Sequence, residues 1–179
     1  MTEETSFSFA IKHTLKAEGL FSDHPADPGG KTMYGITEDV AREAGYTGDM
    51  KDLPKEVAIT IYKRNYWDLL KLDEISSKYV AAEVFDTAVN MGPHWAAIIL
   101  QMAVVILGEQ IEVDGKIGRK TLGVTNSLLP RYEKHLYAAL NGFQFQRYVT
   151  LFESNPANRR AFIRGWMRRL GQFPEMSWG

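Results

Sequence analysis

Residues 17–37 read AEGLFSDHPADPGGKTMYGIT, and the rest of the chain is organised around this stretch. A carboxylate, Glu18, is followed directly by Gly19, and glycine commonly ends a helix. The loop that follows is dense in Pro, Asp and Gly, and its segment 27–30 (DPGG) favours tight turns with positive φ. Residues 31–37 then alternate loosely between β-prone and other side chains. The stretch therefore predicts a helix end, a turn-rich loop and a strand in a small hairpin or sheet.

The helix before this stretch places Glu18 at the end of an apolar row. The helix is predicted to begin near Ser6, and Phe7, Ile11, Leu15 and Glu18 follow at spacings of 4, 4 and 3. Desolvation against apolar neighbours and the negative end of the helix dipole both raise the pKa of a carboxyl group. A raised pKa keeps the group protonated, as a general acid requires. An exposed glutamate at an ordinary helix end has the same spacing, so spacing alone leaves both interpretations open.

Composition describes a globular chain without cysteine chemistry. Its 179 residues, 45% of them hydrophobic, suffice for one domain or for two small lobes that share a core. The absence of cysteine excludes disulfides and Cys-type zinc sites. Residues 1–8 lack a basic residue before an apolar run, and the apolar run 96–107 is too short to span a bilayer. These features predict a chain made in the cytoplasm without a signal peptide.

The net charge of −1 hides an uneven distribution. Residues 1–90 hold ten Lys/Arg and sixteen Asp/Glu, whereas residues 91–179 hold eleven and six. The halves therefore carry net charges of −6 and +5. Such an asymmetry suggests that one half faces an anionic partner, although surface charge is often uneven for no functional reason.

The remaining pattern is mainly helical. Capping residues and apolar periodicity predict further helices that begin at or near Thr37, Pro54, Ser76 or Ser77, Ala96, Gly118, Tyr132 and Pro156. A turn is predicted at Asp114-Gly115. The predicted fold class is mostly α (α+β), a helical bundle with one small β-hairpin or sheet next to the loop of residues 19–30.

Most common catalytic chemistries are not supported by the sequence. The four histidines are scattered, residues 29–32 (GGKT) lack the earlier glycine of a phosphate loop, and no Gly-x-Ser-x-Gly is present. We therefore expect no metal, no cofactor and no nucleic acid. The remaining candidate is a carboxylate mechanism built on Glu18 and a second acid in the loop, Asp23 or Asp27.

At this point the residues resemble a known family. The motifs that carry the resemblance are Glu18-Gly19 and residues 27–37 (DPGGKTMYGIT), 86–92 (DTAVNMG), 113–118 (VDGKIG) and 164–166 (RGW). The first two resemble the signature of glycoside hydrolase family 108, the N-acetylmuramidases found as endolysins of phages and prophages of Gram-negative bacteria. The others resemble the peptidoglycan-binding region that accompanies this family. Together they cover nearly the whole chain.

The resemblance implies roles for individual residues. Glu18 would be the general acid, and Asp27 with Thr32 would hold the attacking water, as in phage lysozymes. That arrangement inverts the anomeric centre and separates the two carboxyl groups by about 6.5–9.5 Å, against about 5–5.5 Å for a retaining pair. Asp23 as the second acid, or a mechanism with a single acid, stays open. The family usually reads Glu-Gly-Gly, and Leu20 here replaces the second glycine.

The resemblance also implies a lysozyme-like fold with a catalytic lobe (1–92) and a helical peptidoglycan-binding lobe (93–179) that share one core. The expected function is hydrolysis of the β-1,4 bond between N-acetylmuramic acid and N-acetylglucosamine in peptidoglycan by a monomer. The enzyme would reach the wall through a membrane pore or after lysis. The alternatives are a lytic transglycosylase that uses Glu18 alone, a catalytically inactive wall-binding module, and a globular domain that ignores glycans.

Side chains suited to a sugar cleft are the aromatic residues near the loop and the polar residues of the helix after Ser77. The candidates are Tyr34, Tyr66, Trp67, Asp86 and Asn90. Aromatic rings pack against pyranose faces, and amide or carboxylate groups bond hydroxyls and acetamides. Core packing is the alternative for the aromatic residues. Asp86 and Asn90 form a polar stripe with Glu83, at spacings of 3 and 4, that faces either solvent or a cleft.

The last predicted helix, residues 156–170, is basic and amphipathic. Its arginines are Arg159, Arg160, Arg164, Arg168 and Arg169, with no acid between them. Its apolar stripe either completes the core or lies on a membrane. Our hypothesis combines the two: the stripe docks, and Arg159, Arg160, Arg164 and Arg168 contact lipopolysaccharide phosphates, an anionic membrane surface or anionic wall polymer.

Overall fold

The structure is a computed structural model, and it describes residues 4–18, 21–22, 31–154 and 163–178. Its helices are α1 (Ser6–Glu18), α2 (Glu38–Glu43), α3 (Lys55–Tyr62), α4 (Lys78–Met91), α5 (Pro93–Ile106) and α6 (Arg119–Ser154). Short helical turns are η1 (Met50–Asp52), the π-helical η2 (Lys63–Asp68), η3 (Leu72–Glu74) and η4 (Pro174–Met176). The strands are β1 (Phe21–Ser22), β2 (Thr32–Met33) and β3 (Ile36–Thr37). The predicted mostly α fold with one small β element is confirmed.

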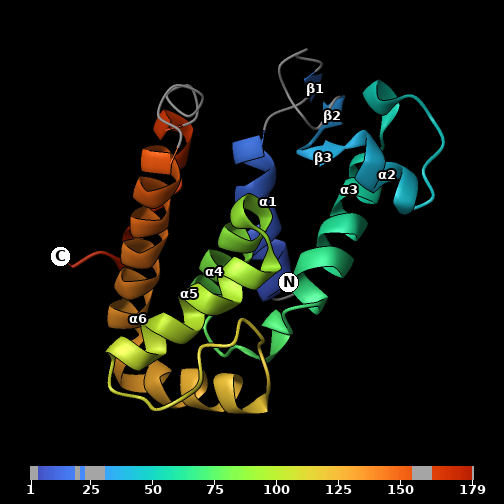
Figure 1. Cartoon of the computed structure of the whole chain (residues 1–179). Coiled ribbons are helices and arrows are strands. Elements are labelled where there is room, and N and C mark those ends of the chain that lie inside the picture. Colours follow the sequence, from blue (N-terminus) through green and yellow to red (C-terminus); the bar gives the residue numbers. More distant parts are fainter. Residues whose placement is uncertain (1–3, 19–20, 23–30, 155–162, 179) are drawn as a thin grey trace.

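Helix α1 lies near the middle of the molecule, between α6 on one side and α3 with the sheet on the other (Figure 1). It packs along α4, and α4 in turn packs on α5 and α6. One continuous cluster of buried side chains runs through these helices, from Ile11 to Leu100 and Leu136. Among the described residues, no helix is both long and apolar enough to cross a bilayer. The cluster contains residues of both predicted lobes, 1–92 and 93–179. The boundary between these lobes stays a prediction.

The three strands form one antiparallel sheet in the order β1-β2-β3. Met33 pairs with Phe21 on one side and with Ile36 on the other. The two residues between β2 and β3, Tyr34 and Gly35, have φ values of 53° and 77°. Positive φ at both central positions is the type I′ geometry, which matches the natural twist of a two-residue hairpin. The expected strand is therefore the centre of a three-stranded sheet.

Capping residues begin the helices where the sequence predicts. The side chain of Thr37 accepts from Val40 N at the start of α2, and that of Ser77 accepts from Val80 N at the start of α4. Helix α1 begins at Ser6 as expected, but the cap is Thr5, whose Oγ1 accepts from Ser8 N at 3.1 Å. These hydrogen bonds satisfy amide groups that the first turn of a helix leaves without a partner.

Gln101, inside the apolar helix α5, holds the predicted turn at Asp114-Gly115. The side chain is 1% exposed. Its Nε2 donates to Asp114 Oδ1 at 2.8 Å and to the Lys116 carbonyl at 3.0 Å, and its Oε1 accepts from Gly115 N at 2.8 Å. The polar residue in this apolar run therefore fastens the segment between α5 and α6 to the core.

Candidate active site

The end of α1 is close in sequence to the first strand of the sheet. Glu18 is the last residue of α1, and two residues separate it from Phe21 in β1. Ser22 of β1 pairs with Thr32 of the central strand, so the backbone connects the helix end to the strand that carries Thr32. The side chain of Glu18 and the whole of Asp27 and Asp23 lie outside the described residues. The identity of the second carboxylate stays a prediction.

The row of α1 that leads to Glu18 faces the core. Ala10 is 1% exposed, Ile11 is 6% exposed and Thr14 is 2% exposed, and Leu15 packs against the same cluster. Glu18 follows four positions after Thr14, which is the next position on this face of a helix. The predicted apolar row on α1 is therefore present up to its last turn.

The structure corrects the prediction for Trp67. This ring is 0% exposed and packs edge-on against Phe7 and Phe85, with ring centroids at 5.3 and 5.5 Å. A sugar cannot reach it, so the proposed sugar contact of Trp67 is wrong and the alternative of core packing holds. Tyr66 is half-buried, with its ring 5.7 Å from that of Tyr62. It retains the exposed surface that a sugar contact needs.

Tyr34 lies at the tip of the β2–β3 hairpin and is half-buried. Its carbonyl accepts a hydrogen bond from the Tyr62 hydroxyl at 2.8 Å. That bond joins the hairpin to α3, directly before the π-helical segment of residues 63–68. The sugar contact of Tyr34 stays a prediction, and its backbone has a structural role that the sequence pattern did not indicate.

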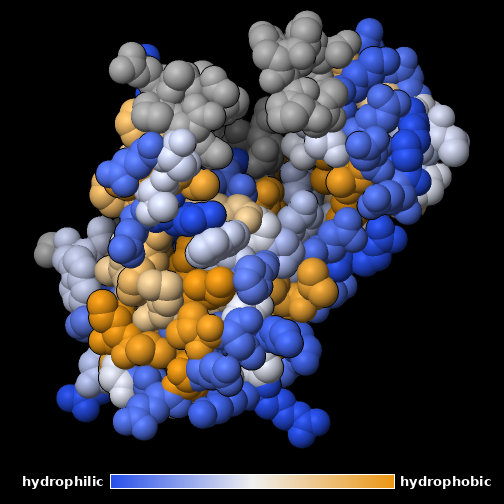
Figure 2. Space-filling model, viewed as in Figure 1, coloured by the Kyte–Doolittle hydropathy of each residue, from blue (hydrophilic) through white to orange (hydrophobic). Residues whose placement is uncertain are grey.

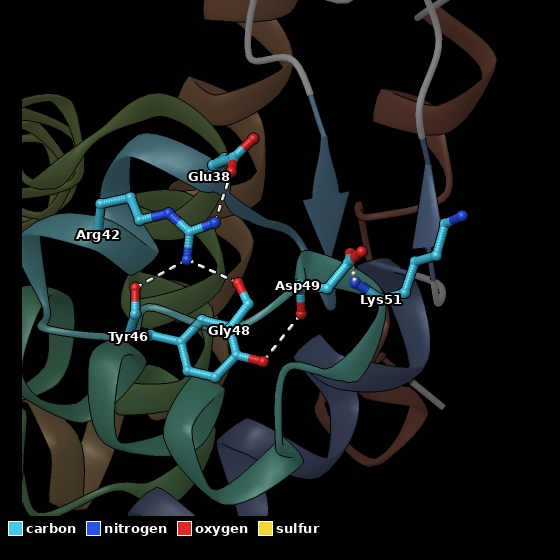
Figure 3. Close-up of polar contacts among 6 residues, drawn as sticks. All are labelled: Glu38, Arg42, Tyr46, Gly48, Asp49 and Lys51. Carbon is cyan, nitrogen blue, oxygen red and sulfur yellow. Dashed lines mark hydrogen bonds and ion pairs between the residues drawn. The ribbon is translucent and has the colours of Figure 1, made fainter.

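A cluster around Arg42 supports the sheet from α2 (Figure 3). Arg42 Nη1 donates to the carbonyls of Tyr46 and Gly48, and Nη2 pairs with Glu38 at 2.6 Å. The Tyr46 hydroxyl donates to the Asp49 carbonyl at 2.8 Å. These bonds shape the loop that brings η1 against β2. We assign this cluster a structural role, since its groups bond one another.

Two of the three members of the polar stripe of α4 face neither solvent nor a pocket. Glu83 is 0% exposed and Asp86 is 2% exposed. Both lie in the contact of α4 with α6 and the C-terminal segment (residues 163–178), where Asp86 Oδ1 pairs with Arg169 Nη1 at 2.7 Å. The predicted sugar contact of Asp86 is therefore corrected: its carboxylate forms a buried ion pair with the end of the chain.

Asn90, the last member of this stripe, is half-buried. Its Oδ1 accepts from the Tyr148 hydroxyl at 3.0 Å. It also lines a pocket of about 250 Å³ with Met91, Trp95, Arg147, Leu151 and Trp166. Asn90 thus keeps a possible ligand contact, although at a pocket that sequence reasoning did not identify. No local pattern indicates this pocket, because its walls come from three helices and the C-terminal segment.

Glu83 has a strongly perturbed acidity. Burial raises the pKa of its carboxyl group well above its ordinary value, and the nearby Asp86 carboxylate raises it further. The Tyr137 hydroxyl and the Asn141 amide lie close enough to lower this pKa in part. Burial and the neighbouring Glu83 also raise the pKa of Tyr137. Burial in the helix interface therefore favours the protonated form of the Glu83 carboxyl group.

We expect Glu83→Gln to change how stability depends on pH. Above the ordinary pKa of glutamate the unfolded chain loses this proton while the folded chain keeps it, so stability falls as pH rises, by up to about 1.4 kcal/mol per pH unit. Glutamine has no proton to lose, so the free energy of unfolding of the variant, relative to that of the wild type, should increase as pH rises. Urea unfolding from about pH 4 to pH 8 measures this. Glu56→Gln, at an exposed position, is the control, and equal slopes for Glu83→Gln and wild type would contradict the prediction.

The C-terminal segment is docked on its inward side. Trp166 stacks on Tyr148, with ring centroids 5.1 Å apart and planes at 10°, and Arg169 pairs with Asp86. Arg164 and Arg168 are exposed. Arg159 and Arg160 lie outside the described residues. Docking of this segment is thus observed, and the contact of its exposed arginines with an anionic surface stays a prediction.

Comparisons with known proteins agree with this architecture. Residues 11–92 match the family model described as Glycosyl hydrolase 108, and residues 95–171 match the one described as Predicted Peptidoglycan domain. A solved structure, described as that of SagA from Brucella abortus, is similar with a TM-score of 0.73 and 29% identity, over 93% of this chain and 90% of that one. No curated protein matches. These likenesses confirm the expected resemblance and fold class.

Proposed function

We propose that this chain is an N-acetylmuramidase of glycoside hydrolase family 108 with Glu18 as its general acid, because residues 11–92 match the model of that family and residues 95–171 match a predicted peptidoglycan domain. The first match supports a glycoside hydrolase, and the second supports peptidoglycan as its partner. The finer proposal is the bond that it cleaves, namely the β-1,4 bond between N-acetylmuramic acid and N-acetylglucosamine.

The observation that carries the proposal is the place of Glu18 in the fold. It is the last residue of a 13-residue helix whose preceding turns face the core. The negative end of a helix dipole and nearby apolar atoms both favour the protonated carboxyl group. A protonated carboxyl group can donate to the glycosidic oxygen as the bond breaks. The adjoining sheet carries Thr32 on its central strand, and Asp27 precedes Thr32 by five residues in the sequence.

In the mechanism that we propose, Glu18 protonates the oxygen of the leaving sugar. Asp27, assisted by Thr32, holds a water on the opposite face of the ring and accepts its proton as the water attacks the anomeric carbon. The product then has the inverted configuration, and the two carboxyl groups need a separation of about 6.5–9.5 Å. The chemistry requires only side chains of this chain and water.

Product analysis tests the proposal. Purified sacculi are digested with the wild-type chain, the fragments are reduced with borohydride, and mass spectrometry identifies the sugar at the reduced end. We expect reduced N-acetylmuramic acid. Anhydro-muramic ends, which borohydride does not reduce and which are lighter than the reduced end by one water and two hydrogen atoms, would show a lytic transglycosylase. Reduced N-acetylglucosamine would show cleavage of the other glycosidic bond. Either result would overturn the proposed bond or reaction. No release of fragments would instead indicate a wall-binding module.

A further inference from the structure

The pocket beside Asn90 lies where three helices and the C-terminal segment meet. The end of α4 contributes Asn90 and Met91, α5 contributes Trp95, α6 contributes Arg147 and Leu151, and the C-terminal segment contributes Trp166. A second pocket of about 190 Å³ between α5 and α6 adjoins it and shares Trp95 and Arg147. Figure 2 shows that apolar side chains gather on the face where α5 and α6 lie. Among the residues that the structure describes, Arg147 is the one cation that lines either pocket.

Arg147 has an unusual electrostatic environment. Its guanidinium carbon lies 3.7 Å from the centre of the Trp95 ring, in cation–π contact. Its Nε atom is buried and has no hydrogen-bond partner among the described residues. No described carboxylate forms an ion pair with it, whereas Arg169 is paired with Asp86. A half-buried guanidinium without an anionic partner destabilises the folded state. The same group is suited to bind an anion from outside.

Contacts with neighbouring residues hold the side chains that line the pocket in place. Trp166 stacks on Tyr148, which is 0% exposed. The Tyr148 hydroxyl donates to Asn90 Oδ1 at 3.0 Å, and this bond ties α6 to the end of α4. A ligand that enters therefore meets aromatic and amide groups that are already positioned, which lowers the entropy lost on binding.

The lining selects a small carboxylate with an apolar body. Two indole rings, a methionine and a leucine give apolar walls, and one guanidinium gives a planar pair of donors that matches a carboxylate. A bare glycan strand offers many hydroxyls that these walls cannot bond. Peptidoglycan also carries short peptide stems, whose free carboxylates stand next to methyl groups of alanine. Among the parts of the polymer, the stem fits this lining best.

We propose that this pocket binds a carboxylate of the peptidoglycan peptide stem, with Arg147 as its ion-pair partner and Trp95 and Trp166 against the adjoining methyl groups. The proposal rests on peptidoglycan as the substrate of the proposed function. It assigns the helical second half of the chain to the peptide, while the Glu18 site acts on the glycan.

Equilibrium binding to the full chain tests the proposal. The probe is a reduced disaccharide-tetrapeptide, and its Kd is measured by titration calorimetry for wild type, Arg147→Met and Arg119→Met. Arg119 is an exposed arginine on the same helix and serves as the matched control. We expect Arg147→Met to weaken binding by about 10-fold or more, since a charged hydrogen-bonded contact is lost. Arg119→Met should bind as the wild type does.

Two further arms make the outcome specific. A peptide-free disaccharide whose lactyl carboxylate is amidated carries no carboxylate and should bind wild type and Arg147→Met equally. A disaccharide-tetrapeptide whose stem carboxylates are amidated should bind wild type about as weakly as the intact probe binds Arg147→Met. The amidated probe also decides the question if Arg147→Met fails to fold. Equal Kd values of wild type for the intact and amidated probes would overturn the proposal. A loss in Arg147→Met that appears only with anionic phospholipid vesicles would overturn it in favour of a lipid contact.

This experiment and the test of the proposed function can fail separately. The binding measurement needs no bond cleavage, so it holds for a transglycosylase or an inactive wall-binding chain as well. Conversely, digestion could release fragments that end in reduced N-acetylmuramic acid while Arg147→Met binds the probe as the wild type does. That result would support the proposed muramidase and contradict the proposed binding of the peptide stem.

Discussion

Replacing Glu18 with glutamine is expected to lower the rate of peptidoglycan hydrolysis by about 10²–10⁴-fold. Glutamine has nearly the same shape and can occupy the same position at the end of α1, but it has no acidic proton for the leaving oxygen. Turbidity loss of purified sacculi measures the rate. The melting temperature should stay close to that of the wild type, since the substitution removes neither apolar volume nor a helix cap.

A matched control is present in the chain. Glu43 is the last residue of α2, as Glu18 is the last residue of α1, and it is exposed. Glu43→Gln should therefore leave the hydrolysis rate unchanged. A Glu18→Gln variant that folds and retains more than about a tenth of the wild-type rate would contradict the assignment of Glu18 as general acid. In that case the proton would have to come from another group.

Removing Asp86 should have the largest effect on stability. Asp86→Leu removes the carboxylate that pairs with the largely buried Arg169 guanidinium, and breaking a buried pair by removing one member costs about 3–5 kcal/mol. The pair is nearly dry, with side-chain exposures of 3% for Asp86 and 12% for Arg169. Urea denaturation measures the free energy of unfolding. The loss should also release the C-terminal segment from α4, which limited proteolysis detects.

A double variant separates the pair from its individual members. Asp86→Leu with Arg169→Leu removes both charges, so it should be more stable than either single variant. Glu4→Gln, which breaks an exposed pair with Lys12, is the control and should have no measurable effect. A double variant as unstable as the sum of the two single variants would show that packing, and not the charge pair, holds the segment.

Local chemistry was readable from the sequence because it depends on neighbours in the chain. The cap at Ser77, the helix end at Glu18 and the β element around Thr32 each follow from the conformational preference of a few adjacent residues. The family signature is local in the same sense, since it lies within residues 18–37. These features determined the fold class and the candidate general acid.

Only the tertiary structure decided what the side chains of each helix meet. Periodicity placed Glu83, Asp86 and Asn90 on one stripe, but it could not show that Arg169 and Tyr148 would cover them. The same holds for Trp67, which is buried, and for Arg147, whose charge lies against Trp95. The physical reason is that a stripe is set by the helical repeat, whereas its partners here lie 58 and 83 residues away in the chain and meet it only when the helices pack.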